Sequence, residues 1–270
     1  MEISNLFTPD DELLKHSVRL CTPAEPDVVA FEEVQVEHSM EVFVNEIPTF
    51  TIVCSPDHLP ELVLGRLCTQ GIVRDAEEVE SIYICQHATR ARVFLRDRQA
   101  QLQRRHVEAV PSCCTGNRTL NSYFEADEPP AKVVPIPWDR RWIFSLARSF
   151  ALDTPLHRRT MGTHSCYLAL GEQILYCCED LGRHNAFDKV VGEALLDEVD
   201  LSQAIVYTSG RIPVDMVMKA IRARIPILVT KAVPTDATIE LAREFDLTLI
   251  CQARPDSFKV FNDPANPICG

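Results

Sequence analysis

The sequence lacks a surplus of positive charge: its 270 residues include 27 Lys and Arg against 39 Asp and Glu, a formal net charge of −12. Proteins that bind nucleic acid neutralise phosphates with basic residues, so this balance argues against that class. No apolar run approaches the roughly 18 residues that a membrane-spanning helix needs. Residues 1–15 lack the basic and then apolar order of a signal peptide. We therefore expect a cytoplasmic protein that binds neither nucleic acid nor membrane.

Spaced pairs of metal-binding cysteines are also absent, although the chain has 11 cysteines. Zinc sites combine cysteine and histidine at short, regular spacings, and Cys177-Cys178 followed by His184 does not supply one. We therefore expect no bound metal. Without a secretion signal, the thiols are expected to stay free in a reducing compartment. Seven lie among Val, Ile, Leu or Tyr and are predicted to be small core residues: Cys54, Cys68, Cys85, Cys166, Cys177, Cys178 and Cys251.

Cys113 and Cys114 have different surroundings, because they lie in a polar turn between Ser112 and Thr115-Gly116-Asn117. An exposed thiol in such a turn can ionise, and the thiolate is the nucleophilic form. Nearby arginines such as Arg118 would lower the pKa of the thiol. The pattern leaves two interpretations open, a reactive cysteine and an idle thiol in a loop.

The first half of the chain reads as short strands separated by turn residues, with one helix among them. We interpret residues 1–128 as a small α+β unit that carries the cysteine loop near its end. Four prolines then predict a linker over residues 129–137. The expected strands cover residues 34–37, 40–44, 49–54, 79–85 and 90–95, and the expected helix covers residues 59–68 and ends near Gly71.

The second half, residues 138–270, reads as an α/β domain in which apolar strands alternate with amphipathic helices. Apolar runs joined by crossover helices predict a sheet covered on both faces, with parallel pairing after an opening antiparallel hairpin. The sheet is therefore expected to be mixed. The expected strands cover residues 165–170, 173–178, 204–208, 227–230 and 247–251, and the expected helices cover residues 142–150, 186–196, 213–223 and 235–245.

Polar segments follow three of these strands: Glu179–Asn185, Ser209–Arg211 and Lys231–Asp236. Ligands of such sheets bind at the carboxyl ends of strands, and the helix N-termini that follow can hold phosphates. Arg183 and Arg211 could supply charged hydrogen-bond donors there.

A structural interpretation of these segments stays open beside the phosphate-binding one. Asn185, Ser209 and Thr235 could be helix caps, and Arg183 could pair with Asp180. His164 and His184 have the same two interpretations, because a single histidine beside a strand is more often structural than catalytic.

Several ordered motifs resemble the FdhD family, and together with segments of the first half they cover about 85% of the chain. The block Glu179–Lys189 is the most specific of them. The others are Gly162-Thr163-His164, Ser209-Gly210-Arg211, Pro234-Thr235 and Arg254, with Val44–Pro48, Leu64–Arg66 and Ile72-Val73 in the first half.

The resemblance implies a sulfurtransferase with a cytidine deaminase-like three-layer core. Such a protein carries persulfide sulfur from a cysteine desulfurase to the molybdenum bis(molybdopterin guanine dinucleotide) cofactor, its bound substrate, before that cofactor enters formate dehydrogenase. A homodimer is expected. The resemblance assigns sulfur transfer to Cys113. It assigns cofactor binding to Gln252, Ala253, Arg254, Pro255, Asp256 and Ser257, together with Arg183, Ser209 and Arg211.

One departure from the family affects the expected chemistry. The family's reactive loop usually carries CxxC, whereas this chain has Cys113 at the first position and Gly116 at the second. A persulfide needs only one thiolate, so a one-cysteine sulfur carrier is our first hypothesis. The alternative is a chaperone that binds and delivers the cofactor without covalent sulfur chemistry. A hydrolytic deaminase is a poor third, because the zinc ligands of its His-x-Glu and Pro-Cys-x-x-Cys motifs are missing.

Overall fold

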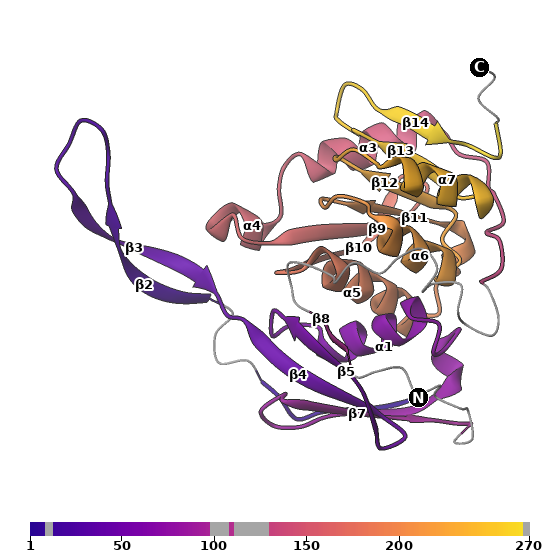
Figure 1. The fold of residues 1–270 in the computed structure, drawn as a ribbon, viewed down its shortest axis with the longest axis horizontal. Coiled ribbons are helices and arrows are strands. Elements are labelled where there is room, and N and C mark those ends of the chain that lie inside the picture. Colours follow the sequence, from indigo (N-terminus) through magenta and orange to yellow (C-terminus); the bar gives the residue numbers. More distant parts are fainter. Residues whose placement is uncertain (9–12, 98–107, 111–129, 267–270) are drawn as a thin grey trace.

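The computed structural model describes residues 1–8, 13–97, 108–110 and 130–266 (Figure 1). Two six-stranded sheets lie on either side of a pair of packed helices, and a two-stranded arm projects from one end. None of the helices in these ranges combines the length and the apolar character needed to cross a membrane.

The first sheet is mixed and has the strand order β1-β6-β7-β4-β5-β8. Alternating residues of β4, such as Met40, Val42 and Val44, are buried, as expected for a strand with one face on a core. The predicted strands at residues 40–44, 49–54, 79–85 and 90–95 are confirmed, and β1 and β8 are additional. The predicted strand at residues 34–37 is wrong, because β3 ends at Gln35. The bounds are β1 Glu2–Asn5, β4 His38–Val44, β5 Ile47–Cys54, β6 Val79–Ile84, β7 Arg90–Leu95 and β8 Glu108–Val110.

Helix α1 (Leu59–Thr69) covers this sheet and confirms the predicted helix. Pro60 lies in its first turn, where a missing N–H costs little. Gly71 follows with φ of 72°, a left-handed conformation that ends the helix as predicted.

The arm consists of β2 (Leu13–Leu20) and β3 (Val28–Gln35), which pair antiparallel along their full length. Its tip carries exposed apolar side chains such as Val29 and Phe31. The sequence analysis expected only a strand at residues 34–37, because this hairpin has no buried face to impose an alternating pattern.

The second sheet has the order β10-β9-β11-β12-β13-β14. Its β9-β10 hairpin is antiparallel and β11, β12 and β13 are parallel, which confirms the predicted mixed sheet. Strand β14 adds an antiparallel edge that was not predicted. The bounds are β9 His164–Leu170, β10 Gln173–Asp180, β11 Ala204–Thr208, β12 Ile227–Thr230, β13 Thr248–Cys251 and β14 Lys259–Asn262.

Both faces of this sheet are covered. On β11, Val206 packs into the core shared with α5, α6 and α7, whereas Ile205 and Tyr207 pack against α3 on the other face. This explains the continuous apolar runs of the central strands. The helix bounds are α3 Arg140–Phe150, α5 Arg183–Leu196, α6 Val214–Arg222 and α7 Asp236–Glu244, and a short α4, Pro155–Thr160, was not predicted.

The part of the expected linker that the structure describes, residues 130–137, forms neither helix nor strand. Its Val133 and Ile136 are nevertheless buried. Val133 also donates its N–H to the carbonyl of Phe245, so the segment is fixed to the end of α7.

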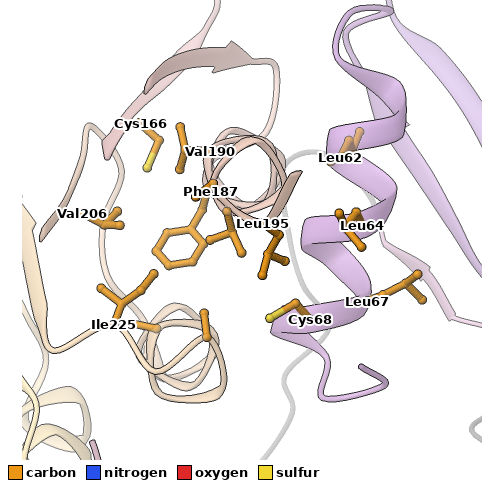
Figure 2. Close-up of a cluster of buried hydrophobic side chains, with 14 of the residues drawn as sticks. Leu62, Leu64, Leu67, Cys68, Cys166, Phe187, Val190, Leu195, Val206 and Ile225 are labelled. Atoms are coloured by element: carbon orange, nitrogen blue, oxygen red, sulfur yellow. The ribbon is translucent and has the colours of Figure 1, made fainter. Parts of the chain in front are cut away.

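Helices α1 and α5 pack face to face and join the two sheets into one continuous core. Figure 2 shows Phe187 and Leu195 of α5 between the side chains of α1 and Val206 of β11. The helices approach closely at two glycines. A Cβ atom on Gly65 would lie 1.8 Å from the carbonyl oxygen of Asp188, and one on Gly192 would lie 1.9 Å from that of Glu61.

The variant Gly192→Ala should therefore destabilise the whole protein. Its methyl group would meet the backbone of α1, which cannot move aside as a side chain can, and overpacking of this kind costs about 1–3 kcal/mol or more. The free energy of unfolding, measured by urea denaturation, tests this. Gly162→Ala is the matched control, because the nearest atom to its Cβ is 3.6 Å away. Equal stability of the two variants would contradict the close approach.

Candidate functional site

The polar segments singled out in the sequence meet at one edge of the second sheet. Strands β10, β11, β12 and β13 all run in the same direction, because β9 is antiparallel to both β10 and β11. Their carboxyl ends and the first residue of β9, His164, therefore lie together, and we call this the strand-end edge (Figure 1). Ligands of sheets with this topology bind at such an edge.

Arg183 is the first residue of α5, so it lies where the helix presents free N–H groups and a positive dipole end. Helix α5 begins three residues before the predicted start at Ala186. The Arg183 side chain packs over Gly210, where a Cβ atom would lie 2.7 Å from the Arg183 Cδ. Within the described part of the chain, the buried Nε of Arg183 has no hydrogen-bond partner. Arg183 as a whole is half-buried.

Ser209 lies just after β11 and joins two strands. Its Oγ accepts a hydrogen bond from the N–H of Ser165 at 3.1 Å and lies 3.1 Å from Nδ1 of His164. It does not cap α6, whose N-cap is Pro213, so the cap interpretation of Ser209 is wrong. Burial, followed by the positive charge of Arg183, lowers the pKa of His164, which favours the neutral ring.

His184, the second residue of α5, is buried. Its Nε2 lies 3.3 Å from the Oδ2 of Asp215 on α6, without the alignment of a hydrogen bond. Burial lowers the pKa of His184 well below its usual value, and the positive charges of Lys219 and Arg183 lower it further. We therefore expect a neutral imidazole at physiological pH.

The segment Gln252–Ser257 forms the turn between β13 and β14. Gln252 adopts φ of 52° and donates its N–H to the carbonyl of Ala232, which fixes the turn to the segment after β12. Ala253 is buried and its carbonyl accepts hydrogen bonds from Tyr207 and from the side chain of Arg254. Arg254, Pro255, Asp256 and Ser257 are exposed.

The segments after β11 and β12 are tied to each other. Ile212 and Pro234 form an isolated parallel bridge, and the Thr230 hydroxyl donates to the carbonyl of Gly210 at 2.7 Å. Thr235 caps α7 through its Oγ1, which confirms the cap interpretation for that residue. Arg211 is exposed and Lys231 is half-buried, so both add positive charge to the edge.

Much of the Glu179–Lys189 block has a structural role that sequence reasoning missed. The buried Lys189 ammonium contacts Asp180 at 2.8 Å and Asp57 at 2.9 Å, and it donates to Ser55 Oγ at 3.1 Å. Burial opposes this charge, but Asp180 and Asp57 raise the pKa of Lys189 above its usual value. Because Ser55 and Asp57 belong to the first half, this cluster fixes α5 to it.

Asp180 completes the cluster and does not pair with Arg183. Its carboxylate accepts hydrogen bonds from Ser55, from the N–H of Gly182 and from the side chain of Asn185. Asn185 also donates to the carbonyl of Val53, so it joins the two halves rather than capping a helix. Both cap and ion-pair interpretations are therefore wrong for this block.

Glu179 caps α4 from a distant strand. Its carboxylate accepts from the N–H groups of Leu156 at 2.9 Å and His157 at 2.7 Å, and from the hydroxyls of Thr154 and Thr163. A carboxylate at a helix N-terminus also opposes the positive dipole end.

A second buried ionic cluster was also missed. Asp188 contacts Lys219 of α6 at 2.5 Å and Arg66 of α1 at 3.3 Å, and it accepts a hydrogen bond from Thr69. Burial and the neighbouring Arg66 lower the pKa of Lys219 to about 7. A charged residue on the apolar face of α1, α5 and α6 was the sequence signal that could have indicated this cluster.

The cysteine predictions are largely confirmed. Cys54, Cys68, Cys166, Cys178 and Cys251 are buried. Cys177 is exposed and Cys85 is intermediate, so the core prediction is wrong for Cys177 and only partly right for Cys85. Cys177 fails because neighbouring strand residues face opposite sides. Cys113 and Cys114 lie outside the described residues.

A cavity of about 720 Å³ lies elsewhere, lined by residues such as Asp75, Arg96, Leu195 and Arg224. Leu195 is at the carboxyl end of α5, and Arg183 is at the other end of this 14-residue helix, roughly 20 Å away. The cavity is therefore separate from the strand-end edge.

Comparison with known proteins supports the family resemblance that the sequence motifs indicated. The model of the FdhD/NarQ family matches residues 35–267. The chain belongs to the FdhD/NarQ family. It is 30% identical to the sulfur carrier protein FdhD of Listeria innocua over 244 residues, covering 86% of this chain and 92% of the relative. It is 32% identical to the protein of the same name from Bacillus pumilus over 233 residues, with 85% and 88% covered.

A crystal structure from Desulfotalea psychrophila is similar over nearly its full length. That protein is proposed to be a formate dehydrogenase accessory protein, and it is 27% identical to this chain. The TM-score is 0.75, with 94% of this chain and 98% of that chain covered. The mixed α/β architecture is therefore shared by this member of the FdhD/NarQ family and that structure.

The buried neutral His184 gives a testable pH dependence. A histidine with a lowered folded-state pKa binds fewer protons than the unfolded chain, so stability falls as pH drops below the unfolded value of about 6.5. Between pH 6.5 and 5.5 this difference amounts to about 1 kcal/mol per residue. His184→Gln should therefore lose about 1 kcal/mol less stability over that interval than wild type, measured by urea denaturation. An equal loss in both proteins would contradict a neutral His184.

Proposed function

We propose that this chain is a sulfur carrier required for formate dehydrogenase activity, and that Cys113 carries the sulfur as a persulfide. The sulfur comes from a cysteine desulfurase and goes to the molybdenum bis(molybdopterin guanine dinucleotide) cofactor. Family membership and relatives that bear the name sulfur carrier protein support this proposal. Action in the cytoplasm, as a homodimer with a cytidine deaminase-like core, is part of the same proposal.

The direction of β8 is the observation that supports it most. Strand β8 runs parallel to β5, and its last residue, Val110, pairs with Ile52. Three residues beyond Ile52, Ser55 donates two hydrogen bonds to Asp180 at the carboxyl end of β10. The carboxyl end of β8 therefore lies on the side of the first sheet that contacts the strand-end edge. Cys113 follows Val110 by three residues in the sequence and lies outside the described residues.

Sulfur loading in this proposal needs one thiolate. The Cys113 thiolate attacks the terminal sulfur of the desulfurase persulfide, a new S–S bond forms, and the desulfurase cysteine leaves as a thiolate. Delivery of that sulfur as sulfide then needs two electrons. An external thiol would supply them, because Gly116 stands where the family's second cysteine would lie.

Charge at the strand-end edge supports binding of the cofactor's phosphates. The half-buried Arg183, the exposed Arg211 and Arg254, and the N-terminus of α5 offer cationic and N–H donors in a protein whose net charge is −12. Ser209 and the turn at Gln252–Ser257 lie beside them. We assign the guanine dinucleotide to this edge.

A cofactor-binding chaperone without sulfur chemistry is the second candidate. The observation that favours it is that Cys251, at the carboxyl end of β13, is buried, whereas Arg211 and Arg254 at the same edge are exposed. Such a protein would bind the cofactor and gain no sulfur on any cysteine.

The Cys113→Ala variant should lose persulfide formation completely, because the only proposed acceptor thiolate is removed. Intact-protein mass spectrometry after incubation with a cysteine desulfurase and ³⁵S- or ³⁴S-labelled cysteine measures the added sulfur. Cys114→Ala is the matched control and should gain sulfur as wild type does. Sulfur gained equally by Cys113→Ala would remove the sulfur-carrier mechanism, and no sulfur on wild type would favour the chaperone.

A further inference from the structure

Three side chains with metal-binding atoms converge at the contact between α1, α5 and β10, away from the strand-end edge. These are His58 at the N-cap of α1, Cys178 of β10 and Glu193 of α5. The imidazole nitrogen, the sulfur and a carboxylate oxygen all lie within 4.8 Å of one another. The Nε2 of His58 is 3.3 Å from Glu193 Oε1. Ligand atoms around tetrahedral Zn²⁺ lie roughly 3.3–3.6 Å apart, given bonds of about 2.0–2.3 Å.

A second carboxylate orients the histidine for this arrangement. Asp57 Oδ2 lies 2.9 Å from His58 Nδ1, which leaves Nε2 directed at the other ligands. The other oxygen of Asp57 is fixed at 2.9 Å by Lys189. A carboxylate that holds the second nitrogen of a histidine is the usual support of a zinc-bound imidazole.

The local charge suits a dication. Glu193 is a member of the cluster, and the Asp57 carboxylate contacts His58. The ammonium of Lys189 contacts Asp57 and Asp180.

We propose that His58, Cys178 and Glu193 form a binding site for Zn²⁺ or a divalent transition metal of similar preference, with the fourth coordination position open to solvent. A thiolate, an imidazole and a carboxylate suit zinc rather than Mg²⁺ or Ca²⁺, which prefer oxygen ligands. The His58 side chain is 45% exposed, so the ion can enter and a water can complete the tetrahedron. The site joins α1 to α5 and thereby adds a third link between the two halves.

The sequence has no short spacing of cysteine and histidine that would indicate this site. Its ligands come from three separate elements, and 120 residues separate His58 from Cys178. The prediction of no bound metal rested on the spacing of cysteine and histidine in the sequence. Spacing does not detect ligands that the fold brings together from distant segments.

Co²⁺ titration of the full-length, reduced protein tests the proposal, because tetrahedral Co²⁺ with a thiolate ligand has a sulfur-to-metal charge-transfer absorption. Wild type should show this absorption at one equivalent of Co²⁺, and Zn²⁺ should abolish it. Cys178→Ser should lose the absorption. Cys177→Ser is the matched control and should keep it, since Cys177 is the next residue on the strand and faces the opposite side.

Two further variants keep the test independent of the cysteine. His58→Asn retains a residue that tolerates the left-handed backbone at this position (φ 50°), and Glu193→Gln retains the shape of the side chain. Both should weaken Zn²⁺ binding at least tenfold in a competition titration, with unchanged circular dichroism. An unchanged absorption in Cys178→Ser, or no binding by wild type, would overturn the proposal. Neither result bears on sulfur loading of Cys113, which this experiment does not involve.

Discussion

The buried ammonium of Lys189 is the interaction on which the rest of the structure depends. A lysine inside a protein must be paired, and its carboxylate partners come from both halves of the chain, Asp57 after β5 and Asp180 at the end of β10. Removing the ammonium would leave the carboxylates of Asp57 and Asp180 without its positive charge. The cluster therefore fixes α5 against the first half, and α5 in turn places Arg183 at the strand-end edge.

This constraint divides the Glu179–Lys189 block into two kinds of residue. The side chains of Glu179, Asp180, Asn185, Asp188 and Lys189 make internal contacts. Arg183 is half-buried at the strand-end edge, and its buried Nε has no hydrogen-bond partner among the described residues. A block of sequence that looks like a binding motif thus consists mainly of scaffold. The same contacts bring the end of β5, and the parallel β8 beside it, next to the edge where a cofactor would bind.

Strands and helices that bury an apolar face were predicted correctly. Their apolar residues, such as Val42 and Leu67, recur every two residues in a strand or about every 3.6 residues in a helix. The prediction failed for the β2-β3 arm, which has no such face. At the site, the strand-end segments were correctly brought together by topology alone. The partners of Asp180, Asp188 and His184 were not predicted. These partners lie on distant elements, and such contacts leave no local pattern in the sequence. The role of Cys113 stays a prediction outside the described residues.

Binding of guanosine diphosphate, as a probe for the nucleotide end of the cofactor, tests most directly whether the cofactor binds at the strand-end edge. The account predicts that Arg183→Ala weakens binding at least tenfold in a calorimetric titration and still accepts labelled sulfur, since the persulfide forms on Cys113. Arg148→Ala, an exposed arginine of α3, serves as the control and should bind as wild type does. Unchanged binding by Arg183→Ala would contradict the assignment of the cofactor to the strand-end edge.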